Sequence, residues 1–188
     1  MKNETRSKLL AAAEQILVLR GITGLSVRKV GEAAGLNPTL VTYHFGSLGK
    51  LLEELRDRNM NPVLAGWEGL EQYDDLDAIL RSWLAPLLMP AAFTEGGRAL
   101  VVIDEIAARG EGDLGEQVMT AMQSFSQRLR DMLAPYCPSL DPTELRARVR
   151  FISAAALGPP PRHRGMTGVG VEDELDYLVR FARIALKE

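Results

Sequence analysis

Apolar residues in the stretch 27–45 recur at helical spacing on both sides of a tight turn. Before the turn they follow the series i, i+3, i+4, i+7 and are Val27, Val30, Gly31 and Ala34; after it, Val41 and Phe45 are four residues apart. The turn is Gly35-Leu36-Asn37, where glycine adopts the positive φ that such a corner demands. The next helix has Asn37 as a good N-cap and Pro38 at its first position. The pattern therefore predicts two short helices packed through their apolar sides.

The polar side of the second helix suits the major groove of DNA. Thr39, Thr42 and Tyr43 face outward, with Arg28 and Lys29 at the start of the preceding helix. Near the start of the following helix, Lys50 can meet a phosphate with both its ammonium group and free backbone N–H groups. These features indicate a helix-turn-helix, although similar helix pairs also occur in proteins that do not bind DNA.

Residues 5–55 resemble the DNA-binding domain of the tetracycline-repressor (TetR) family of bacterial transcription regulators, most specifically in the string GLNPTLVTYHFGS. Besides Lys50, the resemblance implies DNA contacts from nine residues of this string and the helix before it, which are Arg28, Lys29, Asn37, Pro38, Thr39, Leu40, Thr42, Tyr43 and His44. Three positions depart from the family's pattern. Leu48 stands where members usually carry lysine, Gly31 where alanine is common, and Thr42 where an aromatic residue or asparagine is frequent.

The hydrophobic pattern predicts an all-α chain of two parts: a helix-turn-helix DNA-binding domain over residues 1–46 and a helical regulatory domain over residues 47–188. The first helix is expected from Thr5 to Arg20. After the helix-turn-helix, helices are expected over 47–58 (with a continuation beyond a kink at Pro62), 76–88, 98–108, 114–133, 143–157 and 171–186. Pro86 and Pro90 are expected to end the helix that starts at residue 76. Three prolines and four glycines in residues 158–170 predict an exposed loop with a basic tip, Arg162–Arg164.

Bulky, adaptable side chains gather on the middle helices of the second part. They are Met60, Trp67, Trp83, Leu87, Phe93, Ile103, Ile106, Met119, Met122 and Phe125. Such a set is either a filled core or the lining of a ligand pocket, because methionine adapts to irregular space. The TetR resemblance implies a small effector in this half, and it carries over no individual ligand residue.

The last two helices each carry an apolar stripe, which packs either within the monomer or against a second copy. The residues expected at a dimer interface are Val149, Ile152, Ser153, Ala156, Leu175, Leu178, Val179, Ala182 and Leu186. The resemblance implies dimerisation through a four-helix bundle built from these two helices and their symmetry mates.

Charge divides the chain in the same way as the helical pattern. The net charge of −3 consists of +3 on residues 1–58 and −6 on the remainder, so a basic head sits on an acidic body. A lone cysteine and two histidines cannot form a zinc site of standard spacing, and no nucleophile, base or cofactor motif supports an enzyme. No apolar run reaches the ~18 residues of a membrane span and no signal peptide precedes the first helix, so we expect a cytoplasmic protein.

These observations predict a homodimeric regulator of transcription that binds double-stranded DNA. We expect a repressor that a small hydrophobic or amphipathic effector releases from a palindromic operator, with no cofactor. The alternative is a ligand-independent DNA-binding or protein-interaction module whose helical body only dimerises. A filled core, which no small molecule stabilises, would distinguish this alternative.

Overall fold

The computed structural model describes residues 2–93, 98–109, 113–157 and 170–187. Every regular element within these residues is helical, as the sequence predicts. The chain divides into two compact units: a head unit of Met1–Asn61 with Arg98–Thr120, and a body unit of Pro62–Gly97 with Ala121–Glu188. The head unit therefore extends beyond the predicted boundary at residue 46, and two helices, α4 and α7, contribute residues to both units.

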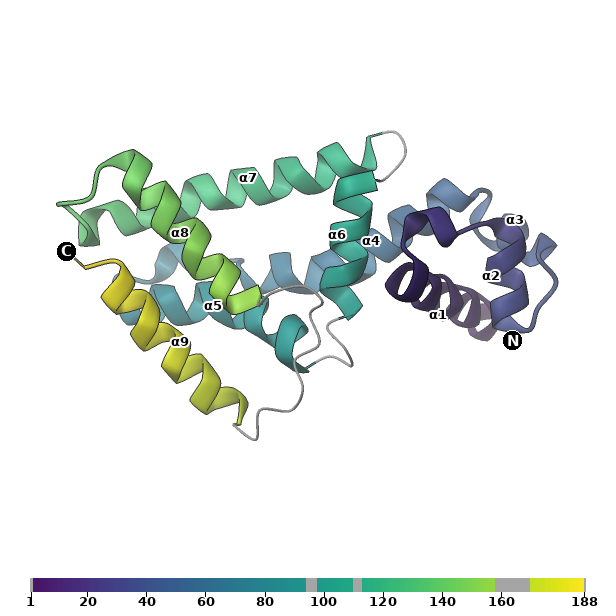
Figure 1. Ribbon diagram of the computed structural model, residues 1–188, viewed down its shortest axis with the longest axis horizontal. Coiled ribbons are helices and arrows are strands. Elements are labelled where there is room, and N and C mark those ends of the chain that lie inside the picture. Colours follow the sequence, from purple (N-terminus) through teal and green to yellow (C-terminus); the bar gives the residue numbers. More distant parts are fainter. Residues whose placement is uncertain (1, 94–97, 110–112, 158–169, 188) are drawn as a thin grey trace. The chain divides into compact units, whose positions relative to one another are not determined.

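The head unit contains the helix-turn-helix and its supports (Figure 1). Its elements are α1 (Lys2–Arg20), the 3-10 turn η1 (Ile22–Gly24), α2 (Val27–Ala34), α3 (Thr39–Phe45), the first part of α4 (Leu48–Gly66), α6 (Arg98–Arg109) and the start of α7 (Leu114–Leu133). Leu9 and Leu17 of α1 are fully buried, as are Val30 of α2 and Val41 of α3. Helix α6 joins this unit because it packs against α1 and η1 and buries its Val102.

The body unit is built around α5 (Leu76–Phe93), which packs against both α8 (Pro142–Leu157) and α9 (Val171–Ala185). The end of α4, the 3-10 turns η2 (Leu70–Gln72) and η4 (Ala134–Tyr136), and the second part of α7 complete it. Trp83, Leu84 and Ile152 are almost fully buried in its core. Figure 1 shows α8 and α9 as the last two helices of this unit.

Helix α5 runs through two prolines that were expected to end it, and α4 runs through Pro62, beyond which a continuation was expected. Helix α5 continues past Pro86 and Pro90 to Phe93, and α4 continues through Pro62 to Gly66. Tight packing accompanies one of these prolines: a Cβ atom on Gly66 would lie 2.5 Å from Cγ of Pro86. The expected end of α5 at Pro86 and Pro90 was wrong because a proline removes only one helical hydrogen bond, which tertiary packing can offset.

Three sequence predictions fall on residues that the structure does not describe: the loop at 158–170 up to residue 169, its basic tip at Arg162–Arg164, and the side chain of Phe93. Among the described residues, no helix combines the length and the apolar content that crossing a bilayer requires.

Candidate nucleic-acid interface and body pocket

Polar side chains fix the start of each helix of the helix-turn-helix. Ser26 caps α2, because its hydroxyl accepts the Lys29 N–H at 3.2 Å. Gly35 ends α2 in the left-handed conformation, with φ of 65°. The Asn37 side-chain oxygen then accepts both the N–H of Thr39 at 2.9 Å and its hydroxyl at 2.8 Å. Asn37 thus acts as the predicted cap, and α3 begins at Thr39 directly after Pro38.

Helices α2 and α3 approach each other most closely at Gly31, one of the three departures from the family pattern. A Cβ atom on Gly31 would lie 2.6 Å from Cα and 2.8 Å from N of Pro38, which are backbone atoms. Such distances are too short for two nonbonded atoms, so an alanine here would force the helices apart. The glycine therefore permits this packing rather than merely weakening α2.

Helix α3 turns a polar face to solvent and an apolar face to the core, as predicted. Val41 and Phe45 are buried, whereas Thr39 and Thr42 are exposed and Tyr43 keeps 71% of its surface accessible. The Tyr43 ring meets the neighbouring His44 ring edge-to-face, with centroids 5.1 Å apart. This edge-to-face contact steadies a large exposed aromatic side chain at the end of α3.

The remaining predicted DNA contacts surround this face. Arg28 is exposed, with its Nε 3.5 Å from an oxygen of Glu32, while Lys29, Pro38 and Leu40 are half-buried. An exposed pair at one helical turn contributes little to stability, so Arg28 is readily available to a phosphate or a base.

The start of α4 differs from expectation. The Lys50 N–H is not free, because it donates to the Ser47 hydroxyl at 3.1 Å, and the Lys50 ammonium pairs with Glu53 at 2.6 Å. Leu48, which stands at the usual lysine position, lines an apolar hollow of about 250 Å³ with Leu25 and Leu52. A contact between Lys50 and a DNA phosphate therefore requires the Lys50 ammonium group to leave Glu53 and pair with the phosphate instead.

Sequence reasoning missed Arg6, which supports the end of α3. Its guanidinium lies over the Phe45 ring, 4.9 Å from the centroid, and forms an ion pair with Glu54 of α4. Arg6 also borders a shallow hollow together with His44 and Lys50. A separation of 39 residues between Arg6 and Phe45 left no local sequence signal.

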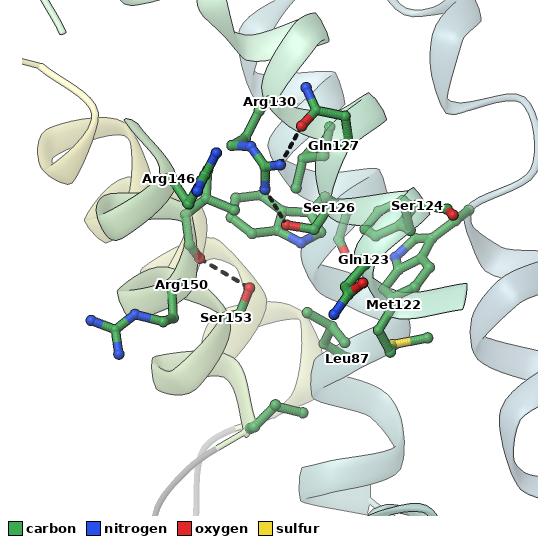
Figure 2. A pocket seen from close by; sticks show the side chains of 16 residues that line it. Leu87, Met122, Gln123, Ser124, Ser126, Gln127, Arg130, Arg146, Arg150 and Ser153 are labelled. Atoms are coloured by element: carbon green, nitrogen blue, oxygen red, sulfur yellow. Dashed lines mark hydrogen bonds between the residues drawn. The ribbon is translucent and has the colours of Figure 1, made fainter. Parts of the chain in front are cut away.

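The body unit contains an open pocket of about 810 Å³, within the size range of small-molecule sites (Figure 2). Five of the residues predicted to line a pocket do line it, namely Trp67, Trp83, Leu87, Met122 and Phe125. Four others belong to the head unit, where Met60 and Ile106 are buried, Ile103 is half-buried and Met119 is exposed. The pocket therefore draws on α5, α7 and α8 rather than on α6.

Aromatic rings form the floor of this pocket. Trp67 and Phe125 stack nearly parallel, with centroids 3.5 Å apart and an interplanar angle of 5°. The indole N–H of Trp67 donates to the backbone oxygen of Trp83 at 2.9 Å, so it presents no unpaired donor to a ligand. The polar wall, which includes Gln123, Ser126 and Arg130, was not predicted, because polar residues on a helix usually mark its solvated face.

Most residues of the two apolar stripes predicted to form a dimer interface are buried within the monomer instead. Seven of the nine residues are buried in the described unit, and these are Val149, Ile152, Ala156, Leu175, Val179, Ala182 and Leu186. Leu178 is half-buried against the same core, and Ser153 lines the pocket. The same helices expose a second apolar face instead, with 58% of Phe151, 56% of Tyr177, 49% of Phe181 and 72% of Ile184 accessible.

The family model and several solved structures name the same family. Residues 9–55 match the model of bacterial regulatory proteins of the tetR family. A putative TetR-family regulator from Rhodococcus sp. is 21% identical with a TM-score of 0.61, over 97% of this chain and 99% of that one. SCO3833 of Streptomyces coelicolor A3, a member of the same family, is 17% identical with a TM-score of 0.71, over 96% and 91% of the two chains. The TetR-family regulator PfmR of Thermus thermophilus is 16% identical with a TM-score of 0.65, over 96% and 95%.

A search of curated proteins finds no significant match. Among the described residues, no group of three or more histidine, cysteine, aspartate or glutamate side chains is placed to hold a metal ion. The matched segment covers most of α1, then η1, α2, α3 and the first part of α4, and the solved structures share the helical fold. Residues 9–55 thus belong to the tetR family of bacterial regulatory proteins, and the chain as a whole has the fold of solved TetR-family regulators.

Proposed function

We propose that this protein is a homodimeric DNA-binding repressor that a small amphipathic effector releases from its operator. The observation that carries the proposal is the amphipathic character of α3. Its outer face exposes Thr39, Thr42 and Tyr43, and its inner face buries Val41 and Phe45. A short, well-capped helix with such a face fits the major groove. Such a regulator acts on chromosomal DNA, which places it in the bacterial cytoplasm.

We assign two kinds of DNA contact to this face of α3 and to the neighbouring Arg28 of α2. Thr39, Thr42 and Arg28 read base edges, and Leu40 meets a thymine methyl group. Tyr43 and His44 position the helix on phosphate or sugar. The basic head, at +3 over residues 1–58, supplies a modest attraction to phosphate, so high affinity requires two heads on one operator.

The exposed apolar face of α8 and α9 supports dimerisation. Tyr177, Phe181 and Ile184 lie at i, i+4 and i+7 of α9, and Phe151 lies on α8. Tyr177 and Phe181 also line a shallow hollow with Ala155 of α8, so the two helices present one continuous surface. We assign this surface to a second copy of the chain, because a large exposed apolar patch marks an interaction site.

A dimer sets the geometry of the operator. Two recognition helices related by a two-fold axis enter successive major grooves, so the half-sites form a palindrome with centres about 34–36 Å apart. Steep weakening of the complex with rising salt is expected, since each phosphate contact releases counterions.

Helix α7 offers a route from the pocket to the head. Its residues 122–127, together with Leu129 and Arg130, line the pocket. Within the head unit, Gln117 of the same helix accepts a hydrogen bond from Arg56 of α4, and Gly115 approaches α6 so closely that a Cβ atom would lie 2.9 Å from the Ala107 oxygen. A ligand that displaces α7 would therefore disturb both helices and the head that they support.

Helix α6 passes the disturbance to the helix-turn-helix. The carboxylate of Glu105 accepts the Ile22 N–H at 2.8 Å, at the start of η1 between α1 and α2. A coupling of about 1–3 kcal/mol along this route would weaken operator binding roughly 5–150-fold.

Operator selection from random DNA tests the proposal. We expect a palindrome with half-sites one helical turn apart, bound by two chains in a salt-sensitive complex. A screen of small molecules for release then tests the effector response. Recovery of no preferred sequence, or of a single half-site bound by one chain, would contradict the dimeric repressor.

A further inference from the structure

The polar wall of the body pocket has an uncompensated positive charge. Its lining includes Arg130, Arg146 and Arg150 and contains no aspartate or glutamate among the described residues. This is unusual because residues 59–188, which include the whole body unit, carry a net charge of −6. The two helical segments that carry these arginines, 117–130 and 145–157, hold five arginines and no acidic residue.

Arginines elsewhere in the described body commonly pair with carboxylates. Arg128 of α7 binds Glu71 at 3.0 Å, Arg148 of α8 binds Glu144 at 2.5 Å, and Arg81 of α5 pairs with Asp176. The pocket arginines differ, since no carboxylate of the described residues lies within ion-pair distance of Arg130 or Arg146.

Uncharged side chains hold the Arg130 guanidinium in place without neutralising its positive charge. Its guanidinium donates to the Ser126 hydroxyl at 2.6 Å and to the Gln127 side-chain oxygen at 2.5 Å, both one turn earlier on α7. These bonds use two of the five N–H donors of the group. Because the side chain is half-buried, an unpaired charge here is costly, and an anion that binds it recovers that cost.

The three arginines do not play the same part. Figure 2 shows the guanidinium groups of Arg130 and Arg146 on the same side of the pocket, contributed by α7 and α8, whereas that of Arg150 extends away from the cluster. The Arg150 guanidinium lies instead over the Phe151 ring, 4.8 Å from its centroid. Arg150 therefore serves as a matched control for the other two.

We propose that the body pocket binds an amphipathic carboxylate, whose anionic end pairs with Arg130 and Arg146 and whose apolar part packs over Trp83, Trp67 and Phe125. The planar fork of arginine matches a carboxylate in a bidentate pair, and the aromatic floor accepts an apolar chain or ring. This inference rests on the proposed function, since it names the chemical class of the effector.

The chain contains its own reporter of binding. It has two tryptophans, Trp67 and Trp83, and both line the pocket. Tryptophan fluorescence and titration calorimetry on the full chain can thus follow decanoate and 4-phenylbutyrate, each beside its alcohol and its amine. We expect the carboxylates to bind about 10-fold or more tightly than the alcohols, and the amines to bind most weakly.

Variants locate the anion. Arg130→Gln and Arg146→Gln should each weaken carboxylate binding about 10-fold or more and leave the affinity for 1-decanol unchanged, which also verifies an intact pocket. Arg150→Gln and Arg128→Gln should keep the carboxylate preference. If Arg130→Gln fails to fold, the carboxylate affinity of Arg146→Gln tests the proposal by itself.

Equal affinity for decanoate and 1-decanol, tighter binding of the amine, or binding of none of the probes would overturn the inference. A separate outcome concerns the proposed function alone. If decanoate binds with the expected dependence on Arg130 but does not release the selected operator, the anion site stands and the effector-controlled repressor fails.

Discussion

At the residue scale, Gly31 is where one missing methyl group decides the packing of α2 on α3. Replacing an interior helical glycine by alanine ordinarily stabilises a helix by about 1 kcal/mol. Here the added Cβ would lie 2.6 Å from the Pro38 Cα, so Gly31→Ala should instead lower the free energy of unfolding by about 1–3 kcal/mol. Urea denaturation followed by circular dichroism measures the change.

Gly49→Ala is the matched control for this substitution. Gly49 also lies within a helix, and the nearest atom to its added Cβ is the Ser47 hydroxyl oxygen at an ordinary 3.6 Å. We expect this variant to be as stable as the wild type or slightly more so. Equal stabilisation by the two alanines would show that the close approach of α2 and α3 carries no constraint.

Cys137 provides a second test at this scale. It is almost fully buried in the body core, and this burial raises the pKa of its thiol, while nearby Arg148 acts in the opposite direction. A raised pKa keeps the thiol protonated at neutral pH, so iodoacetamide should alkylate native protein far more slowly than urea-unfolded protein.

The pH dependence of stability follows from the same raised pKa. The protonated thiol is favoured in the folded state, so its contribution is complete below the unfolded pKa of about 8.5 and is lost as the pH rises through the higher folded value. Cys137→Ala should remove this alkaline loss of stability. Rapid alkylation of the native protein at pH 7 would contradict the burial of this side chain.

At the scale of elements, Glu105 connects α6 to the turn before α2. Glu105→Ala leaves the Ile22 N–H without its side-chain acceptor and should cost about 1–3 kcal/mol, whereas Glu105→Gln retains an acceptor oxygen and should cost less. Denaturation gives the energies, and hydrogen exchange at the Ile22 amide locates the effect. Glu116→Ala, on the exposed surface of α7, is the control. Unchanged exchange at Ile22 in Glu105→Ala would remove this contact from the proposed route.

Helical periodicity predicted most of the elements and could not assign their faces. The bounds of α7 agree with the expected 114–133, and the start of α5 agrees with residue 76. In α9, however, Leu175, Val179 and Ala182 form one apolar stripe and Tyr177 with Phe181 another. Periodicity identifies both stripes, but only the arrangement of α5 and α8 decides which of them the monomer buries.

The candidate sites show the same limit. The local sequence around Gly35 and Asn37 was sufficient to predict α3, because helix caps and turns depend on neighbouring residues. The polar wall of the pocket joins Arg130 to Arg146 from separate helices, so it depends on tertiary packing. The absence of acidic residues from 117–130 and 145–157 was the available signal.

At the scale of the whole molecule, the exposed face of α8 and α9 predicts the oligomeric state. Phe181→Glu places a charge in the centre of this apolar surface, and a buried unpaired charge strongly opposes association. We expect a dimer for the wild type and a monomer for the variant in sedimentation equilibrium. Leu19→Glu changes an apolar residue on α1 that is even more exposed than Phe181, and this variant should remain a dimer. A dimeric Phe181→Glu protein would place the interface elsewhere.

The central claim is that α3 reads DNA, and the most direct measurement is fluorescence anisotropy with the selected operator duplex. Tyr43→Ala and Arg28→Ala should each weaken binding about 10-fold or more while the protein stays folded and dimeric. Tyr73→Ala, which removes an exposed tyrosine from the body unit, should bind as the wild type does. Wild-type affinity in both head variants would contradict the assignment of this face to DNA.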